Sequence, residues 1–263
     1  MPELPDVEVF RRHLDTVALD RSISAVNVLD VDILRNTSAN QLESRLKGHE
    51  FVSTARHGKH LFIGLEDGGW LALHFGMTGY LQYLRHDDSN PRHTRVLFGF
   101  ADGHGLAFVL QRRLGSLTLT PDMKRFVRAH ELGPDALDES LGLEDFEQAL
   151  RGKGSTIKSA LMDQSCVAGI GNIYSDEVLF QAKVHPRAMA SQLDDETVQA
   201  LFASMKDVLA VAIDCQAQPA RFPTHYLLPH RYKEGTCPVC HSALRRVKIS
   251  GRTSYYCPGC QGN

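Results

Sequence analysis

The sequence lacks any long hydrophobic run. Of its 263 residues 43% are hydrophobic, yet no apolar segment approaches the roughly 20 residues that a membrane-spanning helix needs. Charged residues occur too early and too often at the amino terminus for a secretory signal peptide. Internal repeats and low-complexity tracts are also absent. We therefore expect a globular, cytoplasmic protein of about two domains that does not enter a membrane.

A net positive charge is missing as well. The formal net charge is −2, and this value alone argues against a nucleic-acid partner, because phosphate binding requires a positive field. The average conceals an asymmetry, since residues 131–150 carry seven acidic residues and no lysine or arginine. From Arg221 to the end, in contrast, seven basic residues accompany a single acid, Glu234. One surface can therefore be acidic while another binds an anion.

Cysteine is scarce outside the carboxyl terminus. Cys166 and Cys215 stand alone, whereas the other four of the six cysteines fall within the last 27 residues. These four form two Cys-Pro-x-Cys pairs separated by sixteen residues, namely Cys237, Cys240, Cys257 and Cys260. Without a signal peptide the pattern favours a metal over disulfides, and the spacing lets four thiolates surround one Zn²⁺. Four thiolates leave no open coordination position, so we predict a single structural zinc ion.

The residues between the two cysteine pairs are expected to fold as a hairpin rich in basic side chains. This segment carries Arg245, Arg246, Lys248 and Arg252. A guanidinium suits a phosphate because its fork of donors matches two anion oxygens at once. Zinc ribbons also bind proteins, so the finger by itself leaves both kinds of partner open.

Hydrophobic spacing predicts a mixed chain of strands and helices. Helical periodicity begins almost at the first residue and extends to about Leu19. Between residues 23 and 120, short apolar segments indicate a β-sandwich or flattened barrel, including 61–65, 70–75 and 106–110. After Pro121 helical segments replace them, including 143–150, 157–162, 174–181 and 197–213. Residues 216–229 are expected to form a loop that leads into the cysteine-rich tail.

The amino terminus is the most informative stretch. A small residue at position 2 permits removal of Met1, which would expose the secondary amine of Pro2 beside the carboxylate of Glu3. Such an amine can attack a sugar C1′ and form an iminium ion, and α-amino groups titrate about two units below lysine. Glu3 would then serve as acid and base. The alternative is a proline that only starts a helix, where its missing N–H costs nothing.

A glycine-containing segment precedes the expected helix at 174–181. Gly169, Gly171 and Asn172 lie there, so that backbone N–H groups and a helix amino end could hold a phosphate. A plain turn between two helices explains the same residues. The segment gains meaning only together with the amino terminus and the finger.

Taken in order along the chain, these motifs resemble the formamidopyrimidine-DNA glycosylase and endonuclease VIII family of base-excision repair enzymes. The similarity covers essentially the whole length, and several separated motifs match at once. They are Pro2-Glu-Leu-Pro5, His57-Gly-Lys-His60, His74-Phe-Gly-Met-Thr-Gly79, Leu132-Gly-Pro134, Gly169-Ile-Gly-Asn172 and the four-cysteine finger.

The resemblance implies an α+β fold in three parts. These are a catalytic β-sandwich with flanking helices over 1–130, a helix-two-turn-helix DNA-binding domain over 131–225 and a zinc finger over 226–263. It also implies a bifunctional glycosylase and lyase that acts as a monomer on damaged double-stranded DNA. In the family the terminal proline attacks C1′, the base leaves, and β- and δ-elimination leave a gap with phosphates at both ends. Pro2 and Glu3 occupy the matching positions.

The resemblance also assigns residues around the lesion. Lys59 and Arg252 complete the catalytic group by holding phosphates. We expect DNA contacts from His74, Asn172 and Lys158, and a wedge that fills the place of the extruded nucleotide from Met77, Arg112 and Leu114. Without the resemblance, the two lysines would be a turn lysine and an exposed helix lysine. The apolar wedge residues would then be core, and the arginine a surface charge.

The sequence departs from the family at three places. Asp6 stands where the family usually has glutamate, and Leu114 replaces a common phenylalanine, which weakens stacking on the orphaned base. Residues 214–234 lack the longer Gly- and Thr-rich loop that closes over an oxidised purine in the formamidopyrimidine branch. Oxidised pyrimidines, formamidopyrimidines and abasic sites are therefore alternative substrates, and the sequence does not choose among them.

Two other functions compete with the enzyme. A non-catalytic protein that binds damaged DNA could keep the fold and the finger without needing Pro2 and Glu3. A zinc-ribbon module for transcription or protein interaction would not need this pair either. The pair favours the bifunctional enzyme, provided that Met1 is removed, because a retained Met1 turns the Pro2 nitrogen into an amide without a nucleophilic lone pair.

Overall fold

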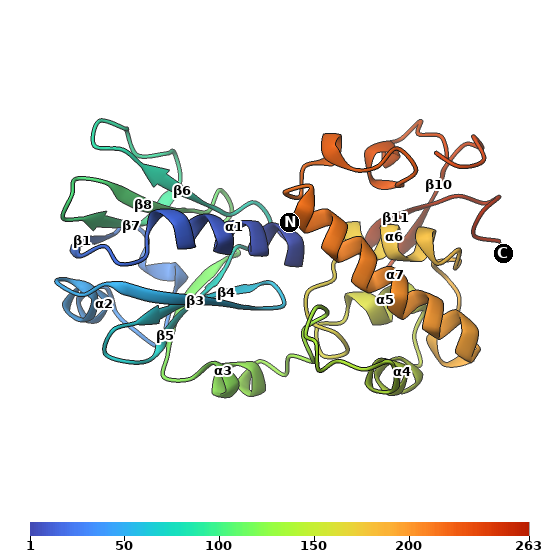
Figure 1. The fold of residues 1–263 in the computed structure, drawn as a ribbon, viewed down its shortest axis with the longest axis horizontal. Coiled ribbons are helices and arrows are strands. Elements are labelled where there is room, and N and C mark those ends of the chain that lie inside the picture. Colours follow the sequence, from blue (N-terminus) through green and yellow to red (C-terminus); the bar gives the residue numbers. More distant parts are fainter. Residues whose placement is uncertain (263) are drawn as a thin grey trace. The chain divides into compact units, whose positions relative to one another are not determined.

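The computed structural model describes residues 1–262, which fold as two compact units. Unit 1 contains Met1–Pro2 and Asp6–His130, and unit 2 contains Glu3–Pro5 together with the chain from Glu131 onward. Unit 1 holds nearly all the strands, whereas unit 2 is mainly helical (Figure 1). The expected α+β class is confirmed. Within the described residues, no helix is both long and apolar enough to cross a bilayer.

Unit 1 is built on two sheets. The first has the strand order β1 (Ile23–Val28), β7 (Thr94–Phe100), β8 (Gly105–Val109), β6 (Tyr80–Leu84). The second has the order β2 (Leu34–Arg35), β9 (Ser116–Thr120), β5 (Trp70–His74), β4 (His60–Leu65), β3 (Phe51–His57). Buried residues of both sheets form one core, in which the rings of Phe51 and Phe98 meet edge to face at 5.4 Å. Two sheets that share a core in this way form the expected β-sandwich.

Three helices accompany the sandwich: α1 (Leu4–Val17), α2 (Ala39–Leu46) and α3 (Met123–Ala129). Val7 and Leu14 of α1 are buried in the core that the two sheets share, and Phe10 contacts the ring of Phe75 at 4.8 Å. Figure 1 shows α1 between the sheet that contains β6 and the sheet that contains β3. The apolar side of α1 therefore completes the sandwich core, as its periodicity predicts.

The strand register brings three connections to one end of unit 1. His74, the last residue of β5, pairs with Ser116 at the start of β9 and with His60 at the start of β4. Tyr80, the first residue of β6, pairs with Val109 at the end of β8. Residues 75–79 and 110–115 therefore cross between the sheets next to each other, beside the turn between β3 and β4.

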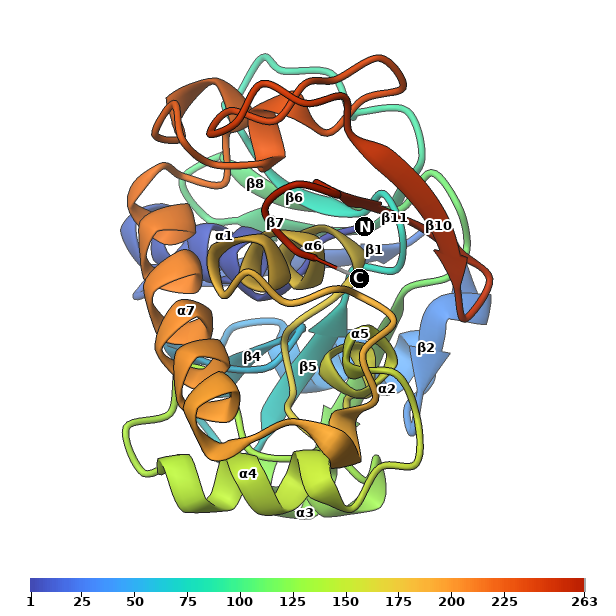
Figure 2. The same ribbon diagram turned by 90° about the vertical axis from the view of Figure 1, so that its right-hand side faces the viewer.

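Helix α6 (Asn172–Gln181) is the centre of unit 2. It contacts α5 (Ile157–Met162), α7 (Asp195–Asp214) and β11 (Arg252–Tyr256), and residues 174–180 are all buried. Figure 2 shows α7 and α4 (Leu143–Arg151) around it. A helix buried on all sides is normally apolar, but Asp176 and Glu177 lie in the middle of this one. Buried carboxylates need partners, and both residues have them.

The chain that follows α7 is bound to the core of unit 2. The N–H groups of Leu227 and Leu228 donate to the Glu177 carboxylate at 3.0 and 2.7 Å. Burial raises the pKa of Glu177 to about 7. The Tyr226 hydroxyl donates to Asp207 at 3.2 Å. Residues 216–229, expected as a loop, therefore form a fixed segment with two short 3-10 turns, η3 (Pro219–Arg221) and η4 (Leu228–His230).

The carboxyl-terminal finger packs on the same helix. Its strands β10 (Arg245–Ile249) and β11 form a hairpin, in which Ser250 and Gly251 have φ values of 47° and 74° between the paired residues Ile249 and Arg252. Two positive φ values in a two-residue turn mark a type I′ hairpin. A small apolar cluster joins the finger to α6 through Phe180, Leu227, Cys237 and Cys257. The regions predicted as the second and third domains thus lie in one compact unit.

Candidate functional site

The first turn of α6 binds the side chain of Glu3. The Glu3 carboxylate accepts hydrogen bonds from the backbone N–H groups of Gly171 at 2.7 Å, Ile173 at 2.9 Å and Tyr174 at 3.2 Å. Only 1% of Glu3 is exposed. N–H groups at a helix start have no partner within the helix and attract anions, so one carboxylate satisfies three of them.

Two glycines give the amino-terminal segment room to approach α6. A Cβ at position 171 would lie 2.4 Å from Cδ of Glu3, and one at position 169 would lie 2.5 Å from Cδ1 of Leu4. Gly169 has a φ of 120°, and its carbonyl accepts the N–H of Leu4 at 3.0 Å. In this structure three of the N–H groups considered for a phosphate, those of Gly171, Ile173 and Tyr174, bind the Glu3 carboxylate.

The hydrogen bonds to Glu3 also restrain Pro2, the residue before it. Pro2 is only partly exposed and is joined by one peptide bond to Glu3, whose carboxylate accepts three N–H groups. A secondary amine freed at this position would have a defined place and a nearby proton acceptor. Such an arrangement suits attack on an electrophilic carbon.

The buried carboxylate of Asp176 joins four segments of unit 2. It accepts hydrogen bonds from Lys158 Nζ of α5 and from Ser254 Oγ of β11. Arg231 Nε donates to it at 2.7 Å and the N–H of Tyr255 at 3.0 Å. The side chains of Asp176 and Lys158 are both 0% exposed. The finger hairpin is therefore tied to α6, the helix that holds Glu3, by a paired and fully hydrogen-bonded charge.

Lys158 does not present its ammonium group at the surface. Besides Asp176, Nζ donates to the Asn172 carbonyl at 3.0 Å and to the Ser175 hydroxyl at 3.1 Å. Burial lowers the pKa of Lys158, and Asp176 opposes this shift. Lys158 is thus not an exposed helix lysine, and its complete burial is incompatible with the direct DNA contact expected for it. The ammonium instead holds α5 to α6.

Asn172 and Arg252 occupy different places relative to the hairpin. Nδ2 of Asn172 donates to the Thr253 carbonyl of β11 at 3.2 Å, which adds a second link between α6 and the finger. Arg252 lies at the exposed turn of the hairpin, next to Gly251. Its guanidinium is therefore carried on a short rigid element whose base is fixed to α6.

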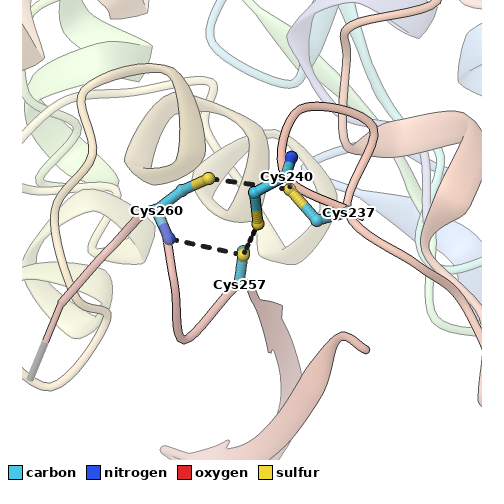
Figure 3. A group of neighbouring side chains, drawn as sticks. All are labelled: Cys237, Cys240, Cys257 and Cys260. Atoms are coloured by element: carbon cyan, nitrogen blue, oxygen red, sulfur yellow. Dashed lines mark hydrogen bonds between the residues drawn. The ribbon is translucent and has the colours of Figure 1, made fainter. Parts of the chain in front are cut away.

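The four predicted cysteine ligands come together at the base of the hairpin (Figure 3). All four Sγ atoms lie within 4.8 Å of one another; Cys237 and Cys260 are 3.7 Å apart, and Cys240 and Cys257 are 3.3 Å apart. Tetrahedral zinc thiolate bonds place sulfurs about 3.8 Å apart. Backbone N–H groups of residues 239, 240 and 260 point at Sγ atoms of the cluster. The four cysteines can bind one metal ion.

Lys59 and His74 lie at the loop-bearing end of unit 1. Lys59 is 8% exposed in the turn between β3 and β4. The N–H of Gly76 donates to Nδ1 of His74 at 3.3 Å. Burial, followed by the charge of Lys59, lowers the pKa of His74, and burial lowers the pKa of His60 beside it to about 3. A backbone hydrogen bond with Leu114 acts in the opposite direction and raises the pKa of His74, so the imidazole contacts the loop that carries Leu114 through its ring.

The predicted wedge residues project from two neighbouring loops. Met77 is 41% exposed and Leu114 is 58% exposed, so neither belongs to the core. Arg112 Nη1 lies 3.3 Å from the Met77 sulfur, which joins the two loops through their side chains. Both side chains are therefore accessible on the surface of unit 1.

The structure thus forms two groups of predicted residues. In unit 2, Glu3, Asn172 and Lys158 surround the start of α6, and the hairpin of Arg252 is tied to the same helix. In unit 1, Lys59, His74 and the wedge residues share one end of the sandwich. The sequence did not point to Asp176, whose only signal is a pair of acids within the helical segment at 174–180.

Comparisons with known proteins find similarity along the whole chain. The N-terminal domain model of formamidopyrimidine-DNA glycosylase matches residues 1–117, and the H2TH domain model of the same enzyme matches residues 132–224. The formamidopyrimidine-DNA glycosylase of Pelotomaculum thermopropionicum is 32% identical and is aligned over 99% of both chains. That of Streptomyces avermitilis is 36% identical, over 99% of this chain and 98% of the relative.

Solved structures agree with the sequence comparison. The wild-type Lactococcus lactis enzyme in complex with DNA containing N7-benzyl-Fapy-dG superposes with a TM-score of 0.91 at 28% identity, covering 100% of both chains. The same enzyme in complex with DNA containing an abasic site gives a TM-score of 0.89, covering 99% of this chain and 100% of the other.

Replacing Gly171 with alanine tests the Glu3 anchor. The added Cβ would collide with the carboxyl group, so we expect Gly171→Ala to release Glu3 and to lower the free energy of unfolding by about 2–4 kcal/mol, as buried N–H groups lose their acceptor. Gly154→Ala is the matched control, because its Cβ meets no atom within 4 Å. Denaturant unfolding of the full chain measures both. Equal stabilities of the two variants would refute the anchor.

Proposed function

The chain belongs to the formamidopyrimidine-DNA glycosylase family and is a DNA repair glycosylase, and from this premise we propose that it also cleaves the DNA strand as a lyase. The nucleophile is the Pro2 nitrogen after removal of Met1. It acts as a monomer on damaged duplex DNA, excising oxidised or ring-opened bases and opening abasic sites. Relatives of known structure bind DNA with ring-opened guanine and with abasic sites, which supports this range of lesions.

The binding of Glu3 by α6 is the observation that carries this proposal. A nucleophile must stay in line with its target, and the three N–H bonds to Glu3 restrain the residue bonded to the nucleophile. The Pro2 nitrogen forms a bond to C1′ as the bond from C1′ to the base breaks. Glu3 lies next in the chain as an acceptor for the proton that the amine must lose. The C1′–O4′ bond of the sugar then breaks, O4′ takes up a proton, and the nitrogen is left joined to C1′ as an iminium ion. The iminium ion makes the C2′ proton acidic, and removal of that proton expels the 3′ phosphate.

The remaining site residues hold the strand. Lys59 is suited, as a cation, to a phosphate beside the lesion, and His74 at the same end of the sandwich contacts the neighbouring DNA backbone. Arg252 on its rigid hairpin offers a fork of donors to a further phosphate. Asn172 and Lys158 act through the interior of unit 2, because their polar groups bind α6 and the hairpin. Met77, Arg112 and Leu114 fill the place that the extruded nucleotide leaves.

Zinc is the metal that suits the four-cysteine site. Thiolates at tetrahedral spacing with no vacancy are typical of structural zinc. When bound, the ion supplies four bonds that hold the base of the hairpin closed. The chain itself, through Asp176, Arg231 and Asn172, then sets where the hairpin lies on α6.

The zinc proposal predicts a linked loss of metal and DNA binding. In Cys257→Ser we expect less than one zinc per chain by elemental analysis, and an affinity for lesion DNA lowered about tenfold or more, because hairpin folding depends on the metal. Cys215→Ser is the matched control, since Cys215 lies outside the cluster. Unchanged DNA affinity in zinc-free protein would show that the metal is not needed for binding.

The nucleophile is tested by blocking the amine without altering the fold. We expect a chain with an uncleavable amino-terminal extension to bind lesion DNA normally and to lose strand cleavage, because an amide nitrogen has no free lone pair. We expect Glu3→Gln to lower the rate of base release by about 100-fold, the usual scale for a lost acid–base group. A chain with the same extension at its carboxyl terminus is the control. Full cleavage by the blocked chain would identify another nucleophile.

A further inference from the structure

The two loops that carry the wedge residues pack against each other through glycines. A Cβ at Gly76 would lie 2.7 Å from the backbone carbon of Leu114, and one at Gly115 would lie 2.5 Å from the His74 carbonyl oxygen. Backbone contact this close excludes any side chain between the loops. The contact fixes the loops to each other but does not by itself fix them to the sandwich.

Arg113, between the wedge residues Arg112 and Leu114, points to the sandwich instead. Its Nε lies 2.9 Å from the Asp30 carboxylate, and its Nη1 lies 3.4 Å from the carboxylate of Asp32. The Asp30 side chain is only 3% exposed, whereas that of Arg113 is 60% exposed. An exposed arginine on the wedge loop is thus paired with a buried carboxylate outside that loop.

Asp30 is itself held in place by several contacts. Its other oxygen accepts the N–H of Asp32 at 3.2 Å, and its N–H donates to the Arg95 carbonyl at 3.2 Å. Arg95 Nη1 lies 3.3 Å from the Asp30 carboxylate, and Arg95 Nε donates to the Leu110 carbonyl at the start of the wedge loop at 3.0 Å. Two arginines therefore connect one buried carboxylate to both parts of the loop at 110–115.

We propose that Arg113 is a positioning residue that locks the wedge to the sandwich through Asp30. The proposal rests on the wedge role given to Met77, Arg112 and Leu114 in the proposed function. Opening a base stack costs free energy. A wedge loop that moves away from the DNA cannot keep the two neighbouring base pairs apart. The ion pair with Asp30 supplies the resistance, and it does so without a contact between Arg113 and DNA.

The alternative is a direct contact between Arg113 and a phosphate, and salt dependence separates the two. A lost phosphate contact reduces the slope of log affinity against log salt by about one, whereas a lost positioning residue leaves the slope unchanged. Asp30→Asn also distinguishes the positioning role from a direct phosphate contact, because a buried aspartate cannot bind phosphate. If Arg113 acts through Asp30, both variants weaken the wedge without changing the salt slope, and Asp30→Asn does so at least as strongly, because it also loses the ion pair with Arg95.

The experiment compares Arg113→Ala, Arg113→Lys and Asp30→Asn with the parent chain and with Arg128→Ala, an exposed arginine of α3 in the same unit. The DNA is a duplex with an abasic site opposite 2-aminopurine, whose fluorescence reports unstacking and needs binding alone. Cleavage of this duplex and of the single-stranded abasic oligonucleotide is measured in parallel. The single strand has no orphaned base and needs no wedge.

For Arg113→Ala and Asp30→Asn we expect less 2-aminopurine signal and a KM on the duplex raised about two- to fivefold, the scale of an ion pair with one exposed partner. Single-strand cleavage and the salt slope should match the parent, and Arg113→Lys should recover part of the signal. A slope reduced by about one, an unchanged signal, or equal loss on both DNAs would overturn the proposal. Absence of cleavage by the parent chain would instead count against the proposed lyase, while the fluorescence still tests Arg113.

Discussion

The hydrogen bonds from α6 to Glu3 are the constraint on which the rest of the site depends. Three N–H groups that a helix cannot satisfy internally receive their acceptor from the third residue of the chain. The bonds draw Glu3–Pro5 into unit 2, although the rest of α1 belongs to unit 1. An amino terminus is ordinarily one of the least ordered parts of a protein, and here its third residue is buried and accepts three hydrogen bonds.

The same helix also determines where the finger lies. Asp176 and Glu177 are neighbours in α6 and bind different segments: Asp176 binds α5 and the hairpin, and Glu177 binds the chain that precedes the finger. Both are buried carboxylates, which cost free energy unless every oxygen has a donor. The buried polar groups of unit 2 therefore fix the positions of the segments that they bind. The base of the Arg252 hairpin and the Glu3 carboxylate are both held by α6.

Much of this could be predicted from the sequence. The helices at 143–150, 157–162 and 197–213 lie within one or two residues of α4, α5 and α7, because their apolar residues recur at helical spacing. The cysteine cluster followed from spacing alone. Helices α2 and α3 were not predicted, since each is short and its start depends on local capping by Ser38 or Asp122. The role of Lys158 could not be foreseen, because its partner Asp176 lies 18 residues away in sequence on a different helix.

The positions of the wedge residues could not be predicted from the sequence, even with the family known. Met77 and Leu114 fit a core pattern, and only the register of β5, β6, β8 and β9 places their loops side by side at an end of the sandwich. Arg113 could not be distinguished from Arg112 by composition. Arg112 contacts Met77, whereas Arg113 pairs with Asp30, which is far away in sequence and whose burial is a property of the folded sandwich.

The nucleophile is tested most directly by borohydride trapping on a duplex with an abasic site, using protein whose Met1 is shown by mass to be absent. Borohydride reduces an iminium ion to a stable amine, so the covalent intermediate can be digested and its peptide identified. We predict a single cross-link on the Pro2 nitrogen. A cross-link on a lysine, or none at all, would contradict the assignment of Pro2 as the nucleophile.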